Sequence, residues 1–254
     1  MKARRLFAAI VALTLMSTFT VPRAANAAEI KVLCSMALKA VAEELFPQFE
    51  RSTNHRVVVQ YALAATQKQK AESGEPFDLI VVTPAMLDDL VKQGKVAADT
   101  RTVVARSGLA LIIKAGAPKP DIGTVDALKR TLLEAKSITY TKEGASGVLF
   151  AQIIAKLGIA DALAPKTQYT SAGEEASANV VSGRAELGVL PVSEILPVKG
   201  AALGGEFPGE TQQYIVMAAG VGAKAGQSAA ARELLKFLMS PSALPVLKAK
   251  GMER

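Results

Sequence analysis

Three turns of the sequence place small residues between an expected strand and an expected helix. They are Ser35-Met36-Ala37, residues 62–66 and residues 141–147, the last reading TKEGASG. Small side chains leave the backbone N–H groups of such a turn accessible, and the dipole of the following helix favours a negative charge there. The pattern indicates an anion site built mainly from backbone amides. The alternative is tight packing of strand on helix without a ligand.

Few side chains in the sequence are suited to catalysis or to metal binding. His55 is the only histidine and lies in the polar turn 52–55, without acidic or cysteine neighbours. We interpret it as a solvated turn residue whose replacement by alanine has no measurable effect. This count excludes histidine-dependent triads and disfavours metal sites. Cys34, the only cysteine, allows no internal disulfide and is expected to be buried at a strand end. No cofactor is implied.

The elements that position these turns are alternating strands and helices. Apolar, β-branched runs predict strands, and apolar residues at helical spacing predict helices. Strands are expected at residues 29–33, 56–61, 77–82, 103–113, 137–140, 167–169, 186–190 and 211–220. Helices are expected at residues 38–49, 67–73, 85–94, 124–133, 148–157, 174–182, 228–239 and 243–250. Pro47 is expected to bend or end the first helix, and residues 199–210 are expected to form a loop.

This alternation predicts an α/β fold with mostly parallel sheets. Ligands of open α/β sheets bind outside the carboxyl ends of the strands, and the three turns follow such ends. The long apolar run at 103–113 contains Ser107-Gly108. A glycine inside so long a strand indicates a bend or a crossing between two bodies. The run at 211–220 is its natural partner.

Residues 1–27 are typical of a cleaved secretory signal. A basic start precedes an apolar stretch from about residue 6 to 19, and the segment ends in Ala25-Asn26-Ala27. The stretch is too short to span a bilayer. Its removal deletes four basic residues and lowers the net charge from +7 to +3. The high pI is therefore weak support for nucleic-acid binding. We expect a periplasmic protein with no nucleic-acid partner and no stable membrane insertion.

Several segments resemble the molybdate-type periplasmic solute-binding proteins. They are LFPQFE (45–50), FDLIVVTPAMLDDLVKQGKV (77–96), GASG (144–147), ELGVLPVSEI (186–195) and FLMSPSALPVLKAKGM (237–252). The resemblance covers residues 29–251 in the same order. It implies a type II periplasmic-binding-protein fold with two α/β lobes, residues 28–106 plus 211–254 and residues 107–210. Two crossing strands would form a hinge that lets the lobes close around a ligand, and the protein would be a monomer.

The resemblance also implies which residues contact the ligand. These are Ser35, Met36, Ala37, Ala64, Ala65, Thr66, Ala145, Ser146, Gly173, Glu174 and Pro191. Molybdate binders commonly keep serine hydroxyls at the positions of Ala37 and of Ala64 or Ala65, and a tyrosine at the position of Pro191. A desolvated dianion that lacks such donors is costly. The ligand is therefore expected to be a small anion, with an organic acid or another oxyanion favoured over molybdate itself.

Two functions fit these residues. The first is a binding protein that delivers its solute to an ABC permease. The second is an enzyme on the same scaffold, because some relatives of this subgroup look like aconitate isomerases, which move a double bond by proton transfer. Such chemistry needs a base near a carbon acid, and Glu143, Glu174, Lys39 and Tyr61 could supply one. Spacing singles out none of them, so the catalytic residue is unknown.

Overall fold

The computed structural model describes residues 27–254, and the expected signal segment lies outside them apart from Ala27. The strands are β1 (Glu29–Ser35), β2 (Arg56–Ala62), β3 (Leu79–Val82), β4 (Thr102–Lys114), β5 (Ile138–Thr141), β6 (Thr167–Thr170), β7 (Leu187–Pro191), β8 (Ala201–Glu206) and β9 (Tyr214–Val221). The helices are α1 (Lys39–Thr53), α2 (Ala64–Glu72), α3 (Pro84–Lys92), α4 (Val125–Glu134), α5 (Ala145–Lys156), α6 (Ala160–Leu163), α7 (Gly173–Ser182), α8 (Val192–Ile195), α9 (Ser228–Leu238) and α10 (Leu244–Ala249). None of these helices is long and apolar enough to cross a bilayer.

The strands form one connected path in the order β2-β1-β3-β9-β4-β7-β5-β6, and β8 pairs with β4. β1 is parallel to β2 and β3, and β5 is parallel to β6 and β7. Every pairing of β4 or β9 is antiparallel. The α/β fold class that the sequence predicts is confirmed, with β4 and β9 as the antiparallel centre between two parallel groups.

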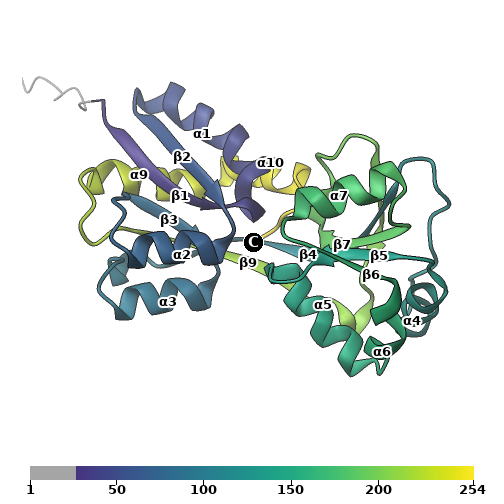
Figure 1. Cartoon of the computed structure of the whole chain (residues 1–254). Coiled ribbons are helices and arrows are strands. Elements are labelled where there is room, and N and C mark those ends of the chain that lie inside the picture. The colour runs from purple at the N-terminus through teal and green to yellow at the C-terminus, as the bar shows by residue number, and fades with distance from the viewer. Residues whose placement is uncertain (1–26) are drawn as a thin grey trace, which may run out of the picture.

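Figure 1 shows the elements gathered in two halves, with β4 and β9 running between them. β4 pairs with β9 over residues 102–108 and with β7 over residues 109–112, so the change of partner falls at Gly108 and Leu109. Because one strand serves both groups, the halves are joined at the crossing that Ser107-Gly108 predicts. We propose the lobe boundaries 28–106 plus 211–254 and 107–210, with β4 and β9 as the hinge.

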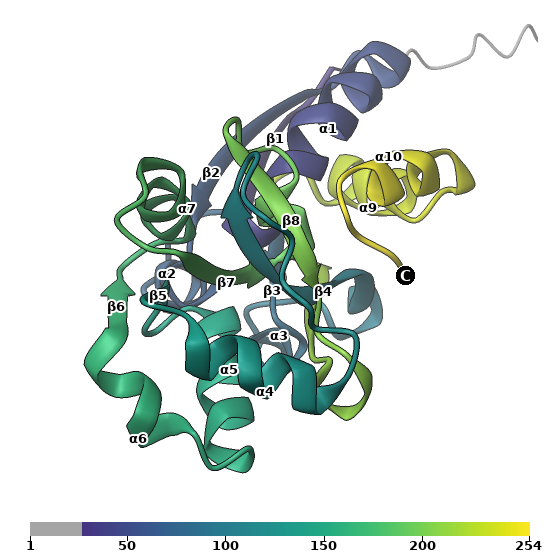
Figure 2. The same ribbon diagram turned by 90° about the vertical axis from the view of Figure 1, so that its right-hand side faces the viewer.

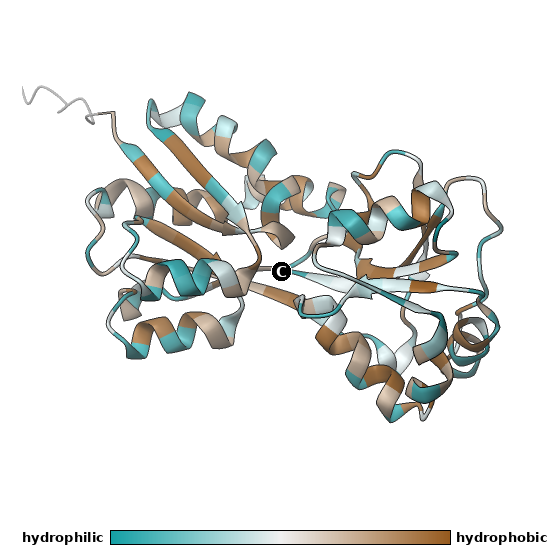
Figure 3. Ribbon diagram, viewed as in Figure 1, coloured by the Kyte–Doolittle hydropathy of each residue, from teal (hydrophilic) through white to brown (hydrophobic). Residues whose placement is uncertain are grey.

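Each half buries its strands between helices. In the first half, α1, α9 and α10 cover one face of the strands, and α2 and α3 cover the other (Figure 1). In the second half, α7 lies on one face and α4 and α5 on the other, with β8 beside β4 (Figure 2). Hydrophobic residues concentrate in the strands and on the inner sides of the helices (Figure 3). Burial of this apolar surface is the main favourable contribution to folding.

The structure contradicts the expectations that Pro47 ends the first helix and that residues 199–210 form a loop. α1 continues through Pro47 and ends only at Asn54, whose φ of 61° breaks the helix. Phe46 and Phe49 are buried on either side of the proline, and their packing holds the turn in place. Residues 199–210, expected as a loop, contain β8. A Cβ at Gly204 would lie 3.1 Å from the side chains of β4, so this glycine allows close strand pairing.

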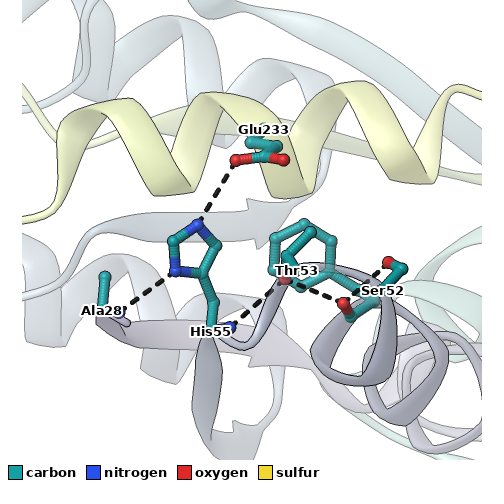
Figure 4. Close-up of polar contacts among 6 residues, drawn as sticks. Ala28, Ser52, Thr53, His55 and Glu233 are labelled. Atoms are coloured by element: carbon teal, nitrogen blue, oxygen red, sulfur yellow. Dashed lines mark hydrogen bonds and ion pairs between the residues drawn. The ribbon is translucent and has the colours of Figure 1, made fainter. Parts of the chain in front are cut away.

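His55 is also different from the expectation, because it is buried and not solvated. Only 7% of the residue is exposed. The backbone N–H of Ala28 donates to its Nδ1 over 3.1 Å, and its Nε2 lies 3.3 Å from a carboxylate oxygen of Glu233 (Figure 4). An accepting Nδ1 leaves the proton on Nε2, which donates to Glu233. His55 therefore joins the start of β1 to α9, a contact between residues far apart in the sequence.

Candidate functional site

A cavity of about 1110 Å³ lies between the two halves. It is lined by residues at the carboxyl ends of β1, β2, β3, β5 and β7, and by residues 214–217 of β9. The residues at these strand ends are Ser35, Ala62, Thr83, Thr141 and Pro191. The expected meeting of the strand tips at one place is therefore present. The end of β3 and the segment of β9 belong to the cavity although sequence reasoning did not include them.

Four helices begin at this cavity without a side chain that caps them. They are α2, α3, α5 and α7, whose N-cap residues are Leu63, Thr83, Gly144 and Ala172. By contrast, α4 begins elsewhere and is capped by Thr124, whose hydroxyl accepts from the N–H of Ala127. The first N–H groups of a helix have no partner within the helix. Four sets of such donors therefore face one space, where the helix dipoles favour an anion.

The structure brings together ten of the eleven residues that the sequence singled out. The cavity lining includes Ser35, Met36, Ala37, Ala64, Ala65, Ala145, Ser146, Gly173, Glu174 and Pro191. Thr66 is exposed and lies outside the lining. α2 begins at Ala64 and not at Gln67, so Thr66 is already an exposed part of the first helical turn.

Glycines bring the start of α5 against the end of β5. A Cβ at Gly147 would lie 1.5 Å from the carbonyl oxygen of Thr141, and one at Gly144 would lie 2.3 Å from its Oγ1. α5 therefore begins at Ala145, three residues before the expected start. The Oγ1 of Thr141 is buried and has no hydrogen-bond partner among the described residues. Since Thr141 lines the cavity, its hydroxyl is a further donor for a ligand, one that the sequence did not indicate.

The ionisable side chains of the cavity are mostly acidic. Among the described residues that line it, Lys39 is the one base, and Glu43, Glu143, Glu174 and Glu194 are the acids. The Nζ of Lys39 lies 3.4 Å from Glu174 and 4.0 Å from Glu43. A fully ionised lining would repel a bare dianion, and the backbone amides, the hydroxyls and Lys39 would have to offset that repulsion. The protonation of these carboxyls therefore decides what the cavity can hold.

Glu194 is the carboxyl whose surroundings are most unusual. It lies in α8, directly after β7, and a Cβ added to Gly173 would lie 2.2 Å from its Oε2. None of the described residues donates a hydrogen bond to it. Burial raises its pKa to about 7, and the negative charge of Glu174 adds to the increase. Glu194 can therefore gain or lose a proton near neutral pH.

Sequence reasoning missed Glu194 although a signal for it existed. Pro191 was placed at the site, and Glu194 follows it by three residues. In a helix that begins after a strand end, this spacing keeps both residues on the same side. The spacing of Glu194 from Pro191 is therefore the feature of the sequence that indicates its place in the site.

The four side chains considered as bases have different positions. Lys39 and Glu174 are paired with each other across the cavity. Glu143 lines the cavity and is exposed. Tyr61 does not line the cavity, and burial raises its pKa above the ordinary value. Within residues 27–254, no group of three or more His, Cys, Asp or Glu side chains is arranged to hold a metal ion.

Comparisons with known proteins match nearly the whole described chain. Residues 30–253 match the family model described as bacterial extracellular solute-binding protein. The chain is 30% identical over 230 residues to an aconitate isomerase from a Pseudomonas species, covering 88% of this chain and 87% of the relative. It is 29% identical to the molybdate-binding protein ModA of Azotobacter vinelandii, covering 90% of this chain and 91% of the relative.

A solved structure has the same fold. The periplasmic molybdate-binding protein of Azotobacter vinelandii superposes with a TM-score of 0.75 at 21% sequence identity. The superposition covers 89% of this chain and 99% of that chain. The match extends over both halves and the strands between them, so the whole architecture is shared.

Proposed function

We propose a function on the basis that the chain belongs to the bacterial extracellular solute-binding proteins and, among them, to the molybdate-type periplasmic binding family. The protein binds a small anion in the cavity between its halves, in the periplasm, after removal of the signal segment. The anion is an organic acid, and the loaded protein delivers it to an ABC importer. The lobes close around the ligand by bending at β4 and β9.

The observation that carries this proposal is the meeting of four uncapped helix starts, from both halves, at one cavity. α2 and α3 come from the first half, and α5 and α7 come from the second. An anion between them accepts hydrogen bonds from both halves at once. Because the ligand interacts with both lobes only when they are close together, its binding favours the closed form.

The lining supports an organic acid over a bare tetrahedral oxyanion. Ser177 and Ser193 already donate their hydroxyl protons to the backbone carbonyls of Gly173 and Ala37, over 3.0 Å and 3.4 Å. These two hydroxyl protons are therefore not available to the many acceptors of an oxyanion. Carbon chains also fit the apolar part of the lining, to which Met36, Val148, Leu149 and Met217 contribute. An organic acid needs amides only at its carboxylate ends.

A ligand screen on the purified exported protein tests the proposal. Thermal unfolding is measured with citrate, trans-aconitate, succinate, sulfate, molybdate and tungstate at equal concentrations. We expect one or more of the organic acids to raise the midpoint, because a ligand at 100 times its Kd stabilises a protein by roughly 2.7 kcal/mol. A response to the metal oxyanions alone, or to none of the six, would contradict the proposal.

Delivery of the ligand to an importer is tested separately, by measuring transport into cells. Cells that lack this protein are given the radiolabelled organic acid identified by the screen, and uptake is compared with that of complemented cells. We expect the complemented cells alone to accumulate the label. Equal uptake in both strains would contradict a role of this protein in import. It would not affect the result of the binding screen.

A second function, isomerisation of a small polycarboxylate, is favoured by two observations. The chain is 30% identical to a protein named aconitate isomerase, and the cavity contains Glu194, whose pKa is raised to about 7 by burial. A base works best when its pKa is near the working pH. Ultraviolet absorbance of cis-aconitate and trans-aconitate with catalytic amounts of protein tests this function. Interconversion that disappears in Glu194→Gln supports it, and its absence in the wild type rules it out.

A further inference from the structure

We propose that the cavity binds a proton together with its ligand, and that Glu194 holds this proton and donates it in a hydrogen bond to a carboxylate of the ligand. The inference rests on the proposed binding of an organic acid and names the side chain that distinguishes one carboxylate of that acid from the others. The amides at the helix starts hold the remaining carboxylates. Glu194 would thereby be a residue that determines specificity.

The position of Glu194 supports this role. It lines the cavity from α8, and its Oε2 packs closely on the first residue of α7, where a Cβ at Gly173 would force the Glu194 side chain to move. Its carboxyl receives no hydrogen bond from the described residues. At this half-buried place an ionised carboxylate receives no donor from the described side chains or backbone, whereas a protonated carboxyl needs an acceptor. A carboxylate of a ligand in the cavity can supply that acceptor.

No cation on the described elements that pack against α8 is paired with Glu194. An ionised Glu194 carboxylate is therefore not stabilised by an ion pair. α8 packs against η1 (Met36–Leu38), β4, β7, β8 and α7. The charged residues of these elements are Arg106 and Lys114 on β4, Glu206 on β8, and Glu174 and Glu175 on α7. Arg106 is paired with Glu253, Glu206 accepts from Gln212, and Glu175 accepts from Ser171.

The charged residues that line the cavity with Glu194 are Lys39, Glu43, Glu143 and Glu174. Glu174 repels a negative charge on Glu194, and Lys39 is held by Glu174. Lys114 does not line the cavity. A second negative charge, that of the ligand, makes ionisation of Glu194 still less favourable, since two like charges at one site cannot both be stabilised. Sharing one proton between the carboxyl and the ligand removes that repulsion and supplies a strong hydrogen bond.

Isothermal titration calorimetry measures the proton directly. Citrate and trans-aconitate are titrated at pH 8 in Tris and in HEPES, whose ionisation enthalpies differ, so the difference in heat gives the number of protons taken up. We expect the wild type to take up close to one proton per ligand. We expect Glu194→Gln, which keeps a hydrogen-bond donor but cannot ionise, to take up none.

The affinity for the ligand should depend on the uptake of the same proton, and therefore on pH. For the wild type, we expect the affinity to fall by up to tenfold for each pH unit above about 7. For Glu194→Gln, we expect an affinity that no longer changes between pH 6.5 and 8.5. The matched control is Glu175→Gln, a neighbouring change on α7 outside the cavity lining, which should leave the proton uptake of the wild type in place.

The outcomes separate the two proposals. Binding with equal proton uptake in the wild type and in Glu194→Gln would overturn proton sharing by Glu194 and leave the proposed function intact. Binding with no proton uptake in either protein would do the same. No heat from either acid at any pH with the folded wild type would instead overturn the proposed ligand class. Glu194→Gln is checked by circular dichroism, so that loss of binding in a folded variant also counts against proton sharing.

Discussion

Lys39 and Glu174 form an ion pair that joins the two halves across the cavity, with 3.4 Å between Nζ and Oε1. Lys39 begins α1 in the first half, and Glu174 lies in the first turn of α7 in the second half. Both side chains are substantially exposed, so the pair itself adds little stability. Its importance is its position, because an anion that enters the cavity competes with Glu174 for the ammonium group of Lys39.

The first prediction concerns the charge of Lys39. Replacing it by methionine keeps much of the side-chain volume and removes the one base of the described lining. We expect Lys39→Met to weaken binding of the organic acid found by the screen by about tenfold or more, which corresponds to roughly 1.4 kcal/mol. Calorimetric titration measures the effect.

A matched control for this change is Lys68→Met. Lys68 also forms ion pairs, with Glu72 and Asp89, but it lies outside the cavity lining. Its replacement should leave the affinity within about twofold of the wild type. Equal affinities for Lys39→Met and the wild type would mean that the anion is held without Lys39.

The second prediction concerns the start of α5. Ser146→Phe should abolish the ligand response, because the bulky ring would occupy the place where the ligand meets the helix. Ser146 is only 6% exposed, so Ala145→Phe, at an exposed lining residue, provides a second test that does not disturb the packing. Ligand-induced thermal shifts measure both variants.

Thr66→Phe is the control for steric blocking. Thr66 lies at another helix start but outside the cavity lining. It should retain the full ligand response, whereas both α5 variants should lose it while keeping their circular dichroism spectra. An unchanged response in folded Ala145→Phe would remove this helix start from the site.

The third prediction concerns His55, for which the structure reverses the expectation drawn from the sequence. His55→Ala removes two hydrogen bonds, to Ala28 and Glu233, and leaves a part-buried backbone N–H without its partner. We expect the free energy of unfolding to fall by about 1 to 3 kcal/mol. Ligand affinity should not change, because His55 does not line the cavity. Urea unfolding and calorimetry measure the two quantities, and an unchanged unfolding midpoint would contradict the structural role.

The fourth prediction is a pH dependence of stability without ligand. The pKa of Glu194 is raised in the folded protein to about 7 from an ordinary value of 4.5. The folded state therefore binds the proton more tightly than the unfolded state. This contribution is fully present below pH 4.5 and is lost as the pH rises through about 7.

Comparison with Glu194→Gln isolates this contribution, since glutamine does not titrate. Between pH 5 and pH 8, we expect the wild type to lose roughly 2 to 3 kcal/mol more of its unfolding free energy than the variant does. Urea unfolding at several pH values measures the difference. Parallel pH profiles for the two proteins would mean that Glu194 titrates normally.

The local pattern of the sequence was sufficient for most of the architecture. Hydrophobic runs and helical spacing gave nearly all the strands and helices, because burial on one face imposes a period that can be read along the chain. The small residues after the strands, together with the family resemblance, indicated ten of the lining residues, since the tips of parallel strands meet at one edge. Ser107-Gly108 likewise marked the place where β4 changes partner.

What only the tertiary structure decided is which distant groups meet. Glu194 is an ordinary acidic residue in the sequence, and its raised pKa arises because folding buries it beside Gly173 and Glu174. His55 looks solvated until Ala28 and Glu233 reach it from 27 and 178 residues away. Hydrophobic periodicity reports which side of an element is buried, whereas desolvation and charge depend on neighbours from other elements. The sequence therefore determined the scaffold and the backbone of the site, and the fold determined its acid chemistry.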